Sequence, residues 1–129
     1  QFMRFLILIL FLGFFSCYNV DRNCKDYKTG TFRFDYVVNN IPKTGTFKRT
    51  NKHSINFYDG KTDSSEVKWI NDCEFVLYKI NPKSISEKDP IHMKILTTTD
   101  SSYTFEYSKA SFNEGETKRK EKGLAIKVD

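Results

Sequence analysis

The sequence has few of the residues and motifs on which catalysis and metal binding most often depend. It holds only two histidines, His53 and His92, and its serines stand in no G-x-S-x-G pattern. Its six glycines are scattered and form no phosphate-binding loop, and no CxxC pair marks a metal site. The carboxylate cluster Asp59, Asp63 and Glu66 fits a turn and a solvated strand face. We therefore expect no enzyme, no cofactor and no metal site.

The sequence also lacks a strong excess of one charge: its basic excess is modest and is spread along the chain. The chain carries 21 basic and 16 acidic residues, for a net charge of +5. The one dense basic stretch, KRKEK (118–122), lies beside acidic NEGE (113–116) and is typical of a solvated loop or a guarded strand edge. Because no aromatic stacking array accompanies it, we expect no nucleic-acid partner. A second interpretation is contact with anionic lipid headgroups.

The only long apolar run, Phe5–Phe15, contains a single glycine and no charge. It is too short for a bilayer-spanning helix, which needs about 20 residues, but it matches the core of a secretory signal behind Arg4. The run ends in LGFFSC (12–17), which resembles the lipobox of bacterial lipoproteins. That resemblance implies cleavage before Cys17 and lipidation of its sulfur. The alternative is a buried N-terminal element of the fold.

The expected organisation follows from the lipobox. Residues 1–16 form the signal peptide, residues 17–29 the lipidated cysteine and a tether, and residues 30–129 a single β domain. The lipid anchor makes the membrane a partner and implies an outer-membrane lipoprotein. Because Asp21 alone is a weak surface-export tag, we favour the periplasmic face over the cell surface.

The cysteines divide once Cys17 is assigned to lipid. Cys24 and Cys73 then remain from a total of three. An exported chain meets an oxidising compartment, so we expect these two to form a disulfide. Two free thiols, or a metal pair completed by a histidine, are the alternatives.

From Gly30 onward, apolar and polar residues alternate with a period of two, and no convincing amphipathic helix is present. Aromatic residues make up 16% of the chain, which favours strands. Strands are predicted at 30–38, 46–50, 53–59, 65–70, 73–80, 91–99, 103–110 and 123–128. Turn chemistry separates them at NNIPKTG (39–45), at Asp59-Gly60 and at NPKSISEKDP (81–90), where one helical turn fits. We predict an all-β fold: an antiparallel up-and-down meander of about eight strands, curled into a small barrel or a strongly bent sheet.

Aromatic side chains form the most prominent pattern on these strands. A barrel of about eight strands either fills itself with side chains or holds one small ligand. The bulk of the rings favours a filled interior, and the alternative is an aromatic ligand cavity. The candidate ligand-binding residues are Phe32, Phe34, Tyr36, Phe57, Trp69, Phe75, Phe105 and Tyr107. His53 fits an inward position, and His92 an outward one.

The layout resembles lipocalin-like domains, which are eight-stranded up-and-down barrels. Gly30-Thr31-Phe32 opens the first strand as the family's glycine-any-tryptophan motif does, with Phe32 in the place of tryptophan. The hairpin rhythm and a disulfide from the N-terminal segment to the barrel also match. The resemblance implies a carrier of a small apolar ligand.

The stretches CKDYKTGTFRF, WINDCEFVL and HMKILTTT are similar to a family of short, uncharacterised lipoproteins of Gram-negative bacteria. Some of those chains carry the label "DNA topoisomerase IV". A type II topoisomerase subunit is far longer and needs machinery for ATP binding or DNA cleavage, so that label does not fit. We expect a non-enzymatic outer-membrane lipoprotein, acting as a binding or accessory module for another envelope component. The alternative function is the lipocalin-like carrier.

Overall fold

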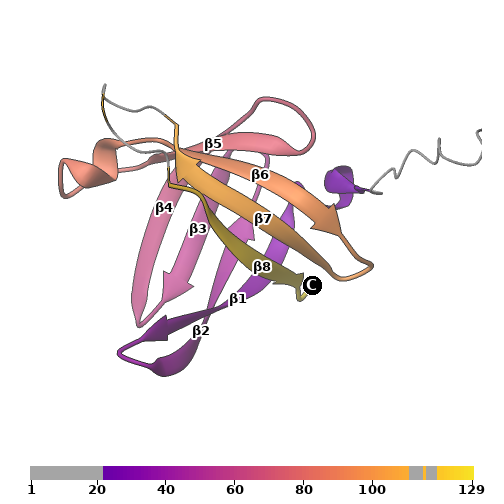
Figure 1. The fold of residues 1–129 in the computed structure, drawn as a ribbon, viewed down its shortest axis with the longest axis horizontal. Helices are drawn as coiled ribbons and strands as arrows, with labels where there is room; N and C mark the ends of the chain where they lie inside the picture. Colours follow the sequence, from indigo (N-terminus) through magenta and orange to yellow (C-terminus); the bar gives the residue numbers. More distant parts are fainter. Residues whose placement is uncertain (1–21, 111–114, 116–118) are drawn as a thin grey trace, which may run out of the picture.

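Eight antiparallel strands follow one another in chain order and close into a barrel, in a computed structural model that describes residues 22–110, 115 and 119–129 (Figure 1). The strands are β1 (Gly30–Val38), β2 (Ile41–Arg49), β3 (His53–Tyr58), β4 (Lys61–Trp69), β5 (Glu74–Lys79), β6 (Ile91–Thr98), β7 (Ser102–Lys109) and β8 (Glu121–Lys127). Two short 3-10 helices accompany them, η2 (Cys24–Tyr27) and η3 (Ser86–Lys88). The predicted all-β, up-and-down architecture is confirmed, and it takes the form of a closed barrel. Within the described ranges, no helix is long and apolar enough to cross a bilayer.

The barrel closes where β8 meets β1. Only two residue pairs join these strands in register, Phe32 with Lys127 and Arg33 with Ile126. One further hydrogen bond, from the Val128 N–H to the Thr31 carbonyl at 2.9 Å, extends the seam. The β1–β2 ladder runs by contrast from Gly30 to Val38 without a break. The seam is therefore the shortest ladder in the barrel.

The β1–β2 turn is shorter than the sequence indicates. Only Asn39 and Asn40 form it, with φ angles of 51° and 63°, a left-handed conformation that asparagine tolerates. The predicted turn over 39–45 is therefore wrong, because β2 already begins at Ile41. Pro42 fits inside this strand because residues 41–45 pair with β1 and have no register partner on β3. The predicted hairpin at Asp59-Gly60 is confirmed.

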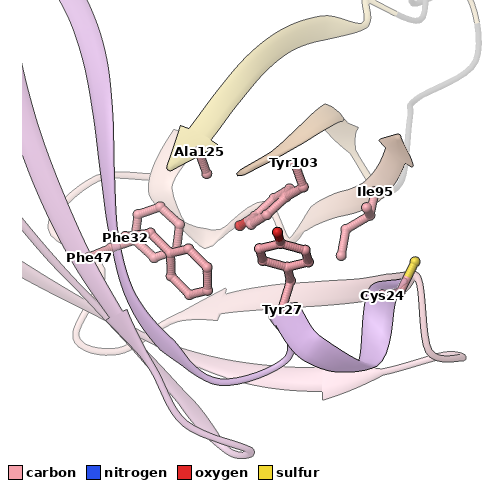
Figure 2. Close-up of a cluster of buried hydrophobic side chains, with 7 residues drawn as sticks. All are labelled: Cys24, Tyr27, Phe32, Phe47, Ile95, Tyr103 and Ala125. Carbon is pink, nitrogen blue, oxygen red and sulfur yellow. The ribbon is translucent and has the colours of Figure 1, made fainter. Parts of the chain in front are cut away.

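One end of the barrel is packed solid, and we call it the closed end. Helix η2 inserts Tyr27 beneath the barrel, where the ring meets Tyr103 at 5.3 Å between centroids (Figure 2). Phe32 and Phe47 stack beside them at 4.9 Å. Each buried ring contributes about 2–3 kcal/mol through the apolar surface it removes from water. The closed-end core comprises Cys24, Tyr27, Phe32, Phe47, Ile95, Tyr103 and Ala125.

Helix η2 is fastened to the barrel covalently and by polar contacts. The predicted disulfide is present and joins Cys24 to Cys73 in the turn between β4 and β5. The Tyr27 hydroxyl donates a hydrogen bond to the Thr99 carbonyl in the turn between β6 and β7. Cys24 and Tyr27, which lie in the segment assigned to the tether from the sequence, therefore pack into the core of the barrel, whereas Lys25 and Asp26 between them are exposed. The signal over 1–16, Cys17 and Asp21 lie outside the described residues.

The face of strand β3 that points into the barrel is the opposite of the predicted one. Its register pairs Ser54 with inward Arg49 and Asn56 with inward Phe47, so these two polar residues point into the barrel. Phe57 consequently lies on the outer face and is 46% exposed, which corrects its predicted inward position. His53 is exposed as well, contrary to its expected inward position.

Candidate ligand-binding cavity

Above the closed-end core, the barrel interior is hollow. A cavity of about 330 Å³ reaches toward the opposite end, which we call the open end. Its walls are apolar and come from Phe34, Leu77, Ile91, Met93, Phe105 and Tyr107. Tyr107 is 38% exposed and marks the rim. The filled interior that the sequence favours is found at the closed end, and the alternative, a cavity lined in part by aromatic rings, is found above it.

Two of the wall rings are held in place by glycines on the neighbouring strand. Phe34 lies over Gly45 and Phe105 lies over Gly123, their register partners on β2 and β8. A Cβ built on either glycine would come within 2.5 Å of the ring that covers it. The missing side chains therefore set how far these two rings can lean back from the cavity.

The cavity floor contains a buried cation. Arg49, at the end of β2, is 2% exposed and shares the floor with Phe47, Phe75 and Tyr103. Its Nε–H donates to the Lys28 carbonyl at 3.1 Å, and one Nη1–H donates to the Tyr103 hydroxyl at 3.1 Å. An Nη2–H donates to the carbonyl of Tyr27. Arg49 thus connects the chain at the end of η2 to the cavity floor.

Aromatic rings surround the same guanidinium group. Its Cζ lies 4.7 Å from the Phe75 centroid, 5.1 Å from Phe32, 5.5 Å from Phe47, 5.6 Å from Tyr103 and 5.8 Å from Trp69. A desolvated cation over a ring face gains about 2 kcal/mol from the ring quadrupole. The aromatic floor therefore offsets part of the cost of burying this charge.

No carboxylate among the described residues forms an ion pair with Arg49, whose interactions are the hydrogen bonds and ring contacts above. Burial raises the pKa of the Tyr103 hydroxyl, an effect that the positive charge of Arg49 opposes in part. Tyr103 consequently keeps its proton at neutral pH and can donate it. The floor thus presents hydrogen-bond donors and a positive charge.

A polar strip completes the lining. Ser54 and Asn56 of β3 contribute it. The sequence did not predict this side of the cavity, because it indicated the opposite face of β3 as the inward one. Neither side chain hydrogen-bonds to another described residue. Both can therefore bind water or a ligand without breaking a contact within the barrel.

The eight aromatic residues predicted as ligand contacts fall into distinct places. Four of them line the cavity: Phe34, Phe75, Phe105 and Tyr107. Phe32 is fully buried in the closed-end core, and Trp69 packs on Phe75 at 4.7 Å. Tyr36 contacts the rings of Phe34 and Tyr58 without lining the cavity. Phe57 is on the outer face, as described above.

Arg49 was not predicted as a site residue. The signal for it lies in TFKRT (46–50), where Arg49 follows Phe47 at the strand period of two. Once Phe47 points inward, Arg49 must do so as well. A charged residue at the end of a strand is usually solvated, so the alternation by itself did not single it out.

A second polar group lies at the open end, outside the cavity. The Lys79 ammonium pairs with Asp63 at 3.3 Å and with Glu87 of η3 at 2.9 Å. Its hydrogen bond to Glu87 is the main cause that raises the pKa of Lys79. This cluster holds the loop between β5 and β6 against the barrel. In the described part of the chain, no group of three or more metal-ligating side chains is present.

Fold and cavity together define a small up-and-down β-barrel with an internal cavity open at one end. Comparison with protein-family models, with curated proteins and with solved structures finds no match for this chain. The resemblances to lipocalin-like domains and to short lipoproteins therefore stay predictions at the level of family.

Proposed function

We propose that the barrel is a binding module for a small, mainly apolar ligand held in its cavity. The cavity itself carries the proposal. Its volume of about 330 Å³ lies within the range of about 300–1,000 Å³ typical of ligand sites. Its walls are apolar, while a few polar groups converge at the floor and on one side. That combination supports orientation of a ligand as well as its burial.

Direction of entry is part of the proposal. The segment that precedes β1 contacts the barrel at the closed end, where the Asn23 N–H donates a hydrogen bond to Thr98 Oγ1 at 2.8 Å. With Cys17 lipidated in the outer membrane, on the periplasmic face, the anchor would attach at the closed end. The cavity mouth would then open away from the point of attachment, toward the aqueous side from which a ligand arrives.

Aliphatic alcohols test the binding of an apolar ligand. We expect 1-octanol to bind the purified barrel in isothermal titration more tightly than 1-hexanol. Two additional buried methylenes, at about 0.8 kcal/mol each, correspond to about 15-fold in affinity. An affinity that does not change with chain length, or no binding of either alcohol, would refute the proposal.

Two variants localise the binding. Asn56→Phe places a ring in the cavity and removes no hydrogen bond between described residues. Ile55→Phe adds a ring to the outer face of the same strand and serves as its matched control. We expect the first variant to lose alcohol binding and the second to keep it. Equal binding by both would place the alcohols outside the cavity.

A second candidate function, an accessory module for another envelope component, is favoured by the tip of the β1–β2 hairpin. Val37 is 66% exposed, Val38 is 40% exposed and Ile41 is 59% exposed. Together they make a small apolar surface beside the open end of the barrel. A photo-crosslinking residue at Val37 should then capture an envelope protein that the same residue at exposed Lys52 does not. Identical patterns from the two positions would remove this candidate.

A further inference from the structure

The cavity floor presents unused donors. A guanidinium group has five N–H donors, and three of those on Arg49 have acceptors among the described residues. Two N–H groups are therefore left over. The Tyr103 hydroxyl accepts a hydrogen bond from Arg49, and its own hydrogen has no acceptor in the described part of the chain. Both residues line the cavity.

The charge of Arg49 is also incompletely matched. Backbone carbonyls, one hydroxyl and five ring faces surround it, but these are neutral groups. A buried arginine normally pairs with a carboxylate, because its planar fork fits the two carboxylate oxygens. Here no carboxylate of the described residues takes that place. An anion from outside the chain would find both a positive charge and hydrogen-bond donors without acceptors among the described residues.

The apolar cavity walls indicate that such an anion also has an apolar part. From the floor to Tyr107 at the rim, the wall opposite Ser54 and Asn56 is formed by apolar and aromatic side chains. Inorganic anions would leave this surface in contact with water. An aliphatic or aromatic body would cover it.

We propose that the ligand of this barrel is a small amphipathic acid, whose carboxylate binds Arg49 and Tyr103 at the floor while its apolar body lies along the cavity wall. This inference rests on the proposed function, since it assigns the ligand class of the same cavity. The carboxylate accepts one or two N–H bonds from Arg49 and one O–H bond from Tyr103. The apolar end points toward the open end of the barrel.

The test compares two ligands that differ in the head group alone. Octanoate, ionised at neutral pH, and 1-octanol share the same chain length. We expect wild-type protein to bind octanoate at least tenfold more tightly than octanol in isothermal titration, because charge-assisted hydrogen bonds exceed neutral ones in strength. Equal affinities would overturn the inference and leave the proposed function standing. Absence of binding by both ligands would refute the proposed function as well.

Variants assign the preference to the two residues. Tyr103→Phe removes one donor and keeps the ring, and Tyr78→Phe on the outer face is its control. Arg49→Lys keeps the charge and loses the fork, with exposed Arg33→Lys as its control. We expect the octanoate-to-octanol ratio to fall at least threefold in Tyr103→Phe and to stay unchanged in both controls.

The affinity ratio also separates binding from a purely structural role. Arg49 holds the carbonyls of Tyr27 and Lys28, so Arg49→Lys will lower stability in either case. A structural role would weaken both ligands equally and leave the ratio at its wild-type value. That outcome in Tyr103→Phe, which removes no contact to η2, would overturn the inference even if Arg49→Lys fails to fold.

Discussion

Reducing the Cys24–Cys73 disulfide should destabilise the barrel strongly. The two cysteines are 49 residues apart, and the loop they close includes β1 to β4. In the chain-entropy model, closing a loop of this length lowers the conformational entropy of the unfolded state and so stabilises the folded state by about 4 kcal/mol. Small domains have only about 5–15 kcal/mol of total stability. Loss of this one bond should therefore consume a large share of the free energy of unfolding.

Urea unfolding, followed by the fluorescence of the sole tryptophan, Trp69, measures the effect. With a slope of about 2 kcal/mol per molar urea, the midpoint should fall by about 2 M on reduction. The double variant Cys24→Ala/Cys73→Ala in reductant should match the reduced wild type. A fall of less than about 0.5 M would refute the argument, because it would show that the unfolded chain is not constrained by the crosslink.

Three further predictions concern packing, ionisation and the anchor. Gly45→Ala should lower the free energy of unfolding by about 1–3 kcal/mol, because the new methyl group would collide with the Phe34 ring. The control Lys48→Ala, at an exposed position of the same strand, should change it by less than about 0.5 kcal/mol. Urea unfolding of the two variants measures the difference. Because the pKa of Tyr103 is raised on folding, the stability linked to its protonation is intact below about pH 10 and declines as the pH rises further. Between about pH 9 and pH 11, the urea midpoint should therefore fall less in Tyr103→Phe than in wild type. Parallel curves of midpoint against pH would contradict this. Intact mass of membrane-extracted protein should show a chain that begins at Cys17 and carries lipid, and a full-length chain with three free thiols would contradict the anchor.

Strand number and topology could be predicted because alternation and turn residues repeat along the chain. Asp59-Gly60 identifies its hairpin directly, since both residues adopt positive φ. The start of β2 could not be predicted, because Pro42 and Gly45 are typical of turns. Pro42 is accepted here by the absence of a β3 partner, and Gly45 by the ring of Phe34 above it. Both conditions depend on neighbouring strands that local sequence does not specify.

The site was predictable to a smaller extent. Phe75 and Phe105 follow the alternation of long strands, and their inward positions are correct. The inward face of β3 depends instead on its register with β2, which places Ser54 opposite Arg49. Ile55 and Phe57 suggest the other face by hydrophobicity alone. Short strands with apolar residues outside therefore need tertiary information before their phase can be assigned.

The central claim, that the cavity holds a ligand, is tested most directly by methyl NMR of methionine. The chain has two methionines, and among the described residues Met93 alone represents this type, in the cavity wall. Protein labelled with methyl-13C methionine should show a Met93 signal that shifts saturably as octanoate is added, and that stays in place in Asn56→Phe. An unmoved Met93 signal at octanoate concentrations that saturate the calorimetric titration would contradict the account.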